Sequence, residues 1–329
     1  MNTKIVYVVT SDPKDYYLEQ TLLSIFSLRK YNDDVVVELV VDKKTDATFC
    51  DKRTAILNYV DKKTVVTVPD KYSKVQTSRY IKTSLRQHVS GDYLFIDSDT
   101  IITESLSSID QYLSDIMAVV NEHVPVSQYF DSYGKRVVKY ARQEGWMISD
   151  DIPYYNSGVM YVKDTEISHR FYSDWHTAWK MTIERFGRHF DQPPLALTNE
   201  KYGYIIQELP GIWNCQILRF GLPFMNNAKV IHYFAAMYKK EDIVYAFRNK
   251  AIYETIREKG CMTDDISKLI DNAKIAFVNP TRVCSGSELK LLSGEMAIFC
   301  VNHPRITTYV LNYIFRVISN IITTLKSKK

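Results

Sequence analysis

Short apolar runs alternate with stretches of helical spacing along the first two thirds of the chain. The apolar runs have the length of buried strands and cover residues 5–9, 35–41, 64–68, 93–96, 116–120, 154–162 and 230–232. Large apolar residues recur at helical spacing in the stretches between them, over residues 18–28, 46–59, 74–90 and 169–186. Strands that alternate with helices are typical of strands joined by crossover connections, so the sequence predicts an open α/β sheet.

Two further stretches complete the predicted organisation. Residues 121–153 are rich in Tyr, Asp, Ser and Gly and predict a long loop or lid beside the ligand site, and the strand over residues 154–162 is expected to break at Asn156-Ser157-Gly158. From about residue 240 onward the pattern is helical. We therefore expect a catalytic domain over residues 1–240 and a helical C-terminal region over residues 241–329, which ends in a basic amphipathic tail (304–329).

The charges are concentrated at the C-terminus. The 329 residues carry a net charge of +4, yet residues 301–329 alone carry five basic and no acidic residues, so the rest sums to about −1 (+4 minus +5). A nucleic-acid-binding domain normally spreads a basic face over its surface, so this distribution argues against nucleic acid as a partner.

The basic tail has an apolar face, which Asn312, Arg316 and Asn320 interrupt. This pattern favours a helix that lies on an anionic membrane surface over one that spans the membrane. The alternative is a helix packed on the body of the protein with a solvated basic end.

The N-terminus and the cysteines bear on the compartment. The first apolar run is too short for the core and cleavage site of a signal peptide. Five scattered cysteines without CxxC spacing suggest neither a disulfide framework nor a zinc site. We expect a cytoplasmic protein, with peripheral contact to the inner face of the membrane through its tail.

Two carboxylates end the apolar run 93–96, in the motif Asp97-Ser98-Asp99. Ligands of open α/β sheets sit at the carboxyl ends of the strands, where the first strand also presents Thr10-Ser11-Asp12. Two carboxylates two positions apart can both reach one Mg²⁺ or Mn²⁺ ion that keeps open positions for phosphate oxygens. A turn with two solvated acids is the other interpretation, but core packing gives no reason to end an apolar strand in two acids.

Five more motifs accompany this one in a fixed order along the chain. They are Ser78-Arg79-Tyr80, Tyr155-Asn156-Ser157-Gly158-Val159-Met160, Asp191-Gln192, Trp213-Asn214 and Ile231-His232, together with the run Tyr93-Leu94-Phe95-Ile96 before Asp97. The set resembles the GT-A glycosyltransferases of family 8, the retaining group that includes glycogenin and bacterial lipopolysaccharide galactosyl- and glucosyltransferases. The resemblance runs from Ile5 to about Tyr238 and implies a Rossmann-like, open mixed sheet.

The resemblance also implies roles for individual residues. A Mn²⁺ or Mg²⁺ ion would be held by Asp97, Asp99 and His232. The catalytic residues would be Asp191, which would hydrogen-bond the donor sugar, and Gln192, which would lie under the anomeric carbon. The donor nucleotide sugar would be bound by Thr10, Ser11, Tyr17, Arg79, Ser98, Asn156, Ser157, Gly158 and Lys239. Trp213 is either a core residue or a platform under a sugar.

The late motif departs from the family pattern H-x-x-G-x-x-K-P-W. The glycine is replaced by Ala235, the lysine falls one position late at Lys239, and the Pro-Trp pair is missing. This change puts the phosphate clamp of the family in doubt for this chain.

The function implied by the resemblance is the transfer of a hexose from a UDP-sugar to a hydroxyl of a glycan or glycolipid acceptor, with retention at the anomeric carbon, in bacterial surface polysaccharide or lipopolysaccharide synthesis. A catalytically silent nucleotide-sugar-binding protein is the first alternative, because the late motif is altered. A metal-dependent nucleotidyltransferase is the second, although the first strand is not followed by the glycine-rich loop of that class.

Overall fold

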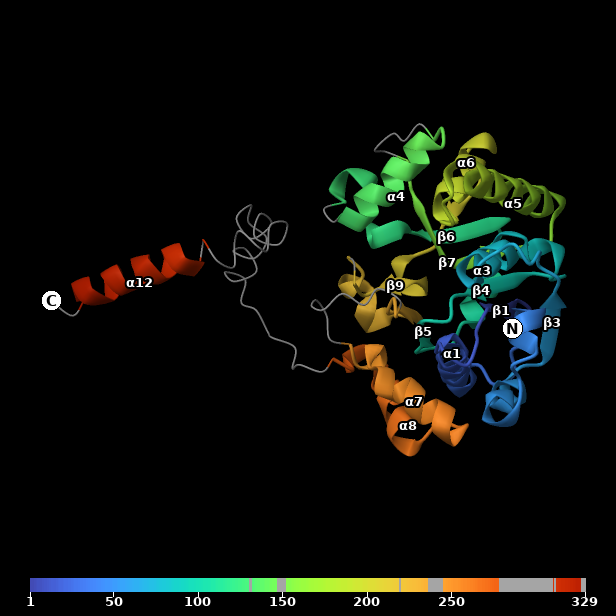
Figure 1. Cartoon of the computed structure of the whole chain (residues 1–329), viewed down its shortest axis with the longest axis horizontal. Coiled ribbons are helices and arrows are strands. Elements are labelled where there is room, and N and C mark those ends of the chain that lie inside the picture. Colours follow the sequence, from blue (N-terminus) through green and yellow to red (C-terminus); the bar gives the residue numbers. More distant parts are fainter. Residues whose placement is uncertain are drawn as a thin grey trace. The chain divides into compact units, whose positions relative to one another are not determined.

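A seven-stranded mixed sheet is the main sheet of the structure (Figure 1). The structure is a computed structural model that describes residues 1–129, 132–146, 152–218, 220–235, 245–277, 310 and 312–326. The strand order is β3-β2-β1-β4-β7-β6-β8, and a second sheet has the order β5-β10-β9. The strands are β1 (Lys4–Val9), β2 (Val37–Asp42), β3 (Lys62–Val66), β4 (Tyr93–Ile96), β5 (Thr100–Ile102), β6 (Ile116–Val120), β7 (Tyr155–Val162), β8 (Gln207–Glu208), β9 (Cys215–Gln216) and β10 (Val230–His232).

The strands β3, β2, β1 and β4 are parallel, whereas β7 runs antiparallel to both β4 and β6. The open mixed sheet that we expected is therefore confirmed. The helices are α1 (Tyr17–Tyr31), α2 (Lys43–Asp46), α3 (Lys74–Thr83), α4 (Ser132–Gln143), α5 (Glu166–Phe186), α6 (Gln192–Lys201), α7 (Lys250–Lys259), α8 (Asp264–Asp271) and α12 (Asn312–Lys326).

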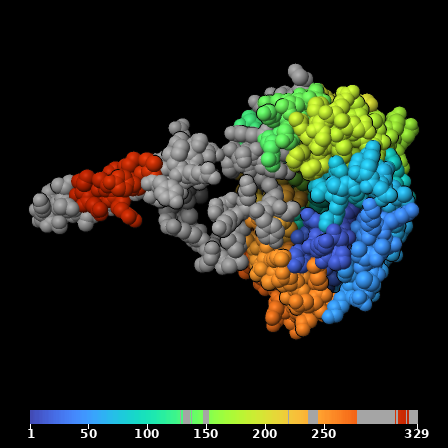
Figure 2. Space-filling view, in the orientation of Figure 1, coloured from blue at the N-terminus to red at the C-terminus, as the bar shows by residue number. Residues whose placement is uncertain are grey.

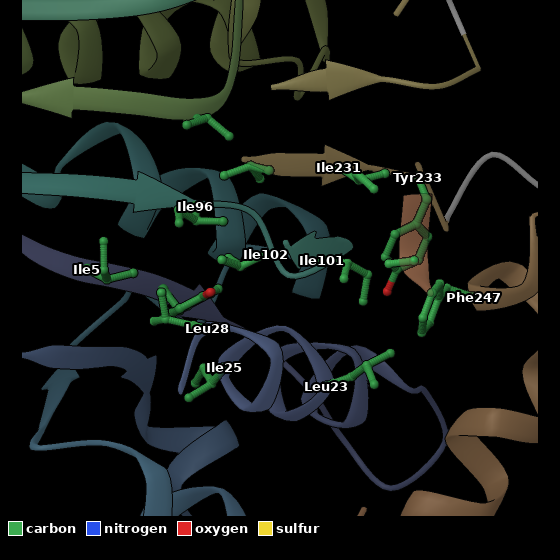
Figure 3. Close-up of a cluster of buried hydrophobic side chains, with 14 of the residues drawn as sticks. Ile5, Leu23, Ile25, Leu28, Ile96, Ile101, Ile102, Ile231, Tyr233 and Phe247 are labelled. Carbon is green, nitrogen blue, oxygen red and sulfur yellow. The ribbon is translucent and has the colours of Figure 1, made fainter. Parts of the chain in front are cut away.

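The side chains of β1 alternate between two hydrophobic clusters, one on each face of the sheet. Ile5 belongs to a cluster with Leu23 and Leu28 of α1, which lies along one face (Figure 3). Val6 belongs to the opposite cluster, which contains Trp175 of α5. A strand with both faces covered reads as a continuous apolar run, which is why β1 could be recognised in the sequence.

The helices α7 and α8 pack against the N-terminal elements rather than apart from them. The buried side chains of Tyr253, Ile256, Ile266 and Ile270 belong to the same cluster as Ile5. Figure 2 shows the orange atoms of this region against the blue atoms of the N-terminal elements, which agrees with the contacts of α7 with α1. The domain boundary expected near residue 240 stays a prediction.

The chain divides into two compact units. The first consists of Met1–Tyr129 and Tyr133–Asn279, and the second of Phe130–Ser132 and Pro280–Lys329. Helix α12 is the main described element of the second unit, and its apolar side chains from Tyr313 to Ile318 are exposed. Within the described ranges, none of the helices has the length and apolar character needed to cross a membrane.

Two sequence-based expectations need correction, and a third needs refinement. The helix expected over residues 46–59 is replaced by α2 and a 3₁₀ segment, Asp51–Tyr59, because Asp51 has a left-handed backbone (φ 48°) that interrupts a helix. The stretch 121–153 is no continuous loop, since it contains α4, whose Val138 and Ala141 pack on Tyr154. The break expected at Asn156-Ser157-Gly158 takes the form of a register shift: β7 is continuous, but Ala118 of β6 pairs with Met160 and Val119 pairs with Asn156, so residues 157–159 are skipped in the pairing.

Candidate functional site

A cavity of about 370 Å³ opens at the carboxyl ends of β1 and β4. It is lined by the end of β1, by Tyr17 of α1 and by one face of α3. The start of β7, the start of α6 and the end of β10 complete the lining. Open α/β sheets bind their ligands at this edge, so the fold places a ligand site where the sequence predicted one.

Asp97, Asp99 and His232 meet in this cavity, with one ligand atom of each within 4.8 Å of the others. Asp97 follows β4 and Asp99 precedes β5, and β10 pairs antiparallel with β5 so that His232 lies opposite Thr100. The pairing brings the Nε2 atom of His232 to 3.3 Å from Asp99 Oδ1. Two carboxylates and an imidazole form a donor set that suits a divalent transition metal such as Mn²⁺.

Neighbouring groups orient these three side chains. The Nδ1–H group of His232 donates to Asn214 Oδ1 over 3.0 Å, which leaves the Nε2 lone pair for a metal. The backbone N–H of Ala235 donates to Asp99 Oδ2 over 2.9 Å. Asn214 stands in the Trp213-Asn214 motif, for which we predicted no site role; the pairing of β9 with β10 is what brings it next to His232.

Gly158 leaves the room that the cluster needs. A Cβ atom at this position would lie 2.6 Å from His232 Cε1 and 2.9 Å from Asp97 Oδ2. The N–H of Asp97 donates to the carbonyl oxygen of Gly158 over 2.7 Å. The backbone of β7 therefore lies directly against the cluster, and only glycine fits there.

The two carboxylates differ in their electrostatic surroundings. Removal from water raises the pKa of Asp97, and the charges of Lys82 and His232 offset this only in part. Removal from water also acts on Asp99, but the charge and hydrogen bond of His232 and the Ala235 N–H group outweigh it and lower the pKa of Asp99. A divalent cation would favour the ionised form of both.

Lys82 was not among the predicted site residues, yet it is buried at the centre of the cavity wall. Its Nζ atom lies 3.2 Å from Asp97 Oδ1 and 3.2 Å from Asp191 Oδ2. It follows Arg79 by three positions on α3, and Arg79 Nε lies 3.4 Å from Asp191 Oδ1. Residues three apart share a helix face, so the helical spacing from Arg79 was a signal for Lys82.

Asp191 is the most strongly stabilised carboxylate of the cavity. Burial pushes its pKa upward, but the charges of Lys82 and Arg79 and a hydrogen bond from Ser157 Oγ outweigh burial. Its pKa therefore lies well below the usual range of an aspartate. Asp191 is ionised at neutral pH and can accept hydrogen bonds from a ligand.

A network of amides lies next to Asp191. Asn121 Oδ1 accepts from Asn156 Nδ2 over 3.0 Å and from Gln192 Nε2 over 3.1 Å. Asn156 Oδ1 in turn accepts from Asn214 Nδ2 over 2.9 Å. The network links the predicted sugar-binding residues to Asn214 and so to His232. Asn121 lies in the stretch that we expected to be a loop.

The backbone beside the cavity is strained at three residues that are not glycine. Glu122, His123 and Phe234 have φ angles of 61°, 58° and 50°. The ring of Phe234 stacks on His232 with centroids 4.0 Å apart, and Glu122 N–H donates to Gln216 Oε1 over 2.9 Å. Such backbone is commonly found at functional sites, where the surrounding structure holds it in place.

The structure brings most of the predicted site residues to this cavity. Those that line it are Thr10, Tyr17, Arg79, Asp97, Ser98, Asp99, Asn156, Ser157, Gly158, Asp191, Gln192 and His232. Ser11 does not line it, because its Oγ atom donates to Asp15 and accepts from Arg53. Lys239 lies outside the described residues. Trp213 is buried, and its indole N–H donates to the hydroxyl group of Tyr112.

The substitution Gly158→Ala is expected to weaken Mn²⁺ binding at least about 10-fold, because the new Cβ displaces His232 and Asp97. Titration calorimetry on the purified protein measures this change. Gly187→Ala is the control, since its Cβ meets nothing within 4 Å and adds only backbone strain at the end of α5. Equal Mn²⁺ affinity in the two variants would contradict the prediction.

The substitution Lys82→Met is expected to destabilise the protein by about 3 kcal/mol at pH 7, because it leaves two carboxylates without their shared cation. The pKa of Asp191 is lowered in the folded state, so its stabilising contribution is present above about pH 4 and lost at lower pH. The loss of unfolding free energy caused by Lys82→Met should therefore become smaller as the pH falls below about 4.

Urea unfolding at several pH values measures both effects of Lys82→Met. Lys201→Met is the matched control, because Lys201 forms an exposed ion pair with Asp174 and should cost less than about 1 kcal/mol. A cost at Lys82 as small as that at Lys201 would contradict the prediction.

Comparison with known proteins gives structural likeness alone. No family model and no curated protein matches the sequence. The galactosyltransferase LgtC, solved with donor and acceptor sugar analogues, is 13% identical with a TM-score of 0.51, and the match covers 81% of this chain and 99% of LgtC.

Two further solved structures are similar to the chain. Mouse xyloside xylosyltransferase 1 is 12% identical over 73% of this chain and 100% of its own, with a TM-score of 0.48. The glycosyltransferase GlyE of Streptococcus pneumoniae is 15% identical over 82% of this chain and 63% of its own, with a TM-score of 0.46. The likeness to LgtC over most of both chains, together with the mixed open sheet, identifies the fold as the GT-A fold of glycosyltransferases.

Proposed function

We propose that the protein is a metal-dependent, retaining glycosyltransferase that moves a hexose from a UDP-sugar to a hydroxyl of a glycan or lipid-linked acceptor. One observation carries the proposal. A single cavity of a GT-A fold joins a metal-ligand cluster, Asp97, Asp99 and His232, to a second cluster in which Asp191 is held ionised by Lys82. The first cluster suits a diphosphate and the second suits the hydroxyls of a sugar.

The three ligands Asp97, Asp99 and His232 fit a Mn²⁺ or Mg²⁺ ion, because Gly158 leaves them space and Asn214 fixes the histidine tautomer. The ion supplies positive charge that stabilises the diphosphate leaving group. The chain adds Arg79 and Lys82, whose cationic groups face the same cavity. Preorganised charge of this kind is normally the largest contribution to lowering such a barrier.

The donor sugar would lie between the two clusters. Asp191, ionised at neutral pH, would accept hydrogen bonds from sugar hydroxyls, and Asn156 would add a further contact. Thr10 and Tyr17 line the cavity at the end of β1 and would contact the nucleotide, with Ser98 between the metal ligands. Lys239 remains a prediction for the phosphate clamp.

The proposed reaction breaks the bond between the anomeric carbon and the phosphate oxygen, whose electron pair leaves with the diphosphate. The acceptor oxygen bonds to the same face of that carbon, and its proton passes to the departing phosphate oxygen. Gln192 donates its Nε2–H to Asn121, so its carbonyl end is the one that a ligand can use. An amide oxygen is a poor nucleophile, which favours an oxocarbenium-like transition state over a covalent enzyme intermediate.

The first test is calorimetry of UDP, UDP-glucose, UDP-galactose and GDP-mannose, each with and without Mn²⁺. We expect binding that requires both Mn²⁺ and a uridine diphosphate, and slow hydrolysis of one UDP-sugar. Asp99→Asn should reduce that hydrolysis about 100-fold, because it removes a charged metal ligand. Asp174→Asn, on the outer face of α5, is the matched control.

Wild-type hydrolysis in Asp99→Asn would contradict the role of the metal cluster. Binding of a UDP-sugar with Mn²⁺ but without hydrolysis or transfer would favour the silent nucleotide-sugar-binding protein. No binding of any of the four compounds would leave the GT-A likeness as a statement about fold alone.

We further propose that the basic tail (304–329) holds the protein on an anionic membrane surface. Support comes from α12, in which Tyr313, Ile314, Phe315, Val317, Ile318 and Ile321 are all exposed. Arg316 and the basic end of the tail add charge complementary to anionic lipid, worth about 1 kcal/mol per residue near the surface. A lipid-linked acceptor would be reached from this position.

The membrane proposal is tested by flotation of the full chain with vesicles that contain or lack anionic lipid. We expect the full chain to float with anionic vesicles and a chain that ends at residue 303 to remain at the bottom. Ile314→Asp with Ile318→Asp should weaken flotation while the tail keeps its basic residues. Equal flotation of the full and shortened chains would contradict the proposal.

A further inference from the structure

We infer that helix α7 (Lys250–Lys259) acts as a clamp: it lies outside the cavity and holds in place two segments next to it. Arg257 of this helix is the positioning residue for the part of the cavity that would bind the nucleotide. Among the described residues that line the cavity, none belongs to α7. The helix nevertheless contacts the turn between β1 and α1 and the residue that follows β10, and both neighbour residues that line the cavity. The part of the inference that concerns nucleotide binding rests on the proposed function.

Arg257 reaches from α7 to the turn between β1 and α1. Its Nε and Nη2 atoms each donate to one carboxylate oxygen of Glu19, both over 2.9 Å. Its Nη1 atom donates to the carbonyl oxygen of Pro13 over 2.9 Å, and Nη2 also contacts the carbonyl oxygen of Asp15. One planar guanidinium group therefore fixes two backbone positions of the turn relative to α1.

A second arginine holds the same turn from the opposite end. Arg53 pairs with Glu19 over 3.4 Å and donates to Ser11 Oγ over 3.0 Å. Ser11 Oγ donates in turn to Asp15 Oδ1 over 2.7 Å. Glu19 is buried, with 4% of its side chain exposed. Its ion pairs should therefore contribute more to stability than exposed surface ion pairs do.

The residue that follows the turn is enclosed by α7 as well. The Tyr16 hydroxyl donates to Glu254 over 3.0 Å, and the Arg257 guanidinium lies 4.3 Å from the centre of the Tyr16 ring. Tyr17 is the next residue and lines the cavity, as does Thr10 before the turn. A fixed turn therefore presents Thr10 and Tyr17 in one arrangement.

On its other side, α7 supports the strand that carries the metal-ligand histidine. The Tyr253 hydroxyl donates its one proton to the carbonyl oxygen of Phe247 and accepts a hydrogen bond from the Tyr233 hydroxyl over 2.9 Å. Figure 3 shows Tyr233 beside Phe247 in this cluster. Tyr233 follows His232, and its N–H donates to the carbonyl oxygen of Asp99 over 3.1 Å. One helix thus contacts both the turn that precedes Tyr17 and the residue that follows His232.

Loss of Arg257 should act locally, because Arg53 still neutralises Glu19. Binding to a turn that must first become ordered is weaker than binding to a turn that is already fixed. The clamp therefore predicts weaker nucleotide binding in a protein that still folds and still binds metal.

The experiment compares the full-length wild type with Arg257→Met and with Arg170→Met, a control at an exposed ion pair of α5. Hydrogen exchange of residues 10–20 in the free protein should become at least about 10-fold faster in Arg257→Met alone. The Kd for UDP in the presence of Mn²⁺ should rise about 10-fold, while the Kd for Mn²⁺ alone stays unchanged. Arg257→Lys keeps the positive charge but loses the planar guanidinium group with its paired donors. Its exchange rate and its Kd for UDP should therefore lie between those of the wild type and of Arg257→Met.

Unchanged exchange of residues 10–20 in Arg257→Met would overturn the clamp. A parallel loss of UDP affinity, Mn²⁺ affinity and melting temperature would overturn the positioning role and leave a general structural one. If the wild type bound no UDP, the proposed function would fail, and the exchange measurement would still decide whether Arg257 holds the turn.

Discussion

Mutual repulsion of three carboxylates is the constraint on which the candidate site depends. Asp97, Asp99 and Asp191 face one cavity, and their charges can coexist there only if cations lie between them. Lys82 lies between Asp97 and Asp191. A metal ion held by Asp97, Asp99 and His232 would supply the remaining positive charge, because a histidine that binds through its Nε2 lone pair is neutral. The fold meets this requirement by bringing α3 and β10 to the same cavity, so the topology and the charge balance are inseparable.

The antiparallel pairing of β5 with β10 is equally important, because it decides which side chains can reach the metal cluster. It brings together Asp99 and His232, which are distant in the sequence, and it places Ala235 where its N–H can hold the Asp99 carboxylate. The α7 helix supports this pairing from outside through Tyr253 and Tyr233. The interior of the cavity is thus built by one set of elements and kept in shape by another.

The sequence was most informative where one local signal determined the structure. The buried runs of β1 and β4 and the Asp97-Ser98-Asp99 motif could be located directly, because a fully covered strand is continuously apolar. The short strand β5 has no such pattern. The left-handed backbone at Asp51 could not be predicted either, because the spacing of apolar residues does not depend on it. Lys82 was missed although its helical spacing from Arg79 was a signal, and Asn214 was noted only as part of a motif, because the contacts of both residues are with other elements. The engagement of Ser11 by Arg53 and Asp15 is likewise a tertiary contact that no local pattern records.

The distance in sequence between Asp99 and His232 has a consequence for how the protein matures. A chain that has emerged only as far as the Asp97-Ser98-Asp99 motif holds two of the three proposed ligands and no β10 to supply the third. Under the proposed metal role, tight metal binding would follow closure of the second sheet, because the three ligands are not assembled before that. An ion that binds only after β10 has paired with β5 stabilises that folded form. Metal binding would therefore stabilise the protein late in folding and would not start the folding process.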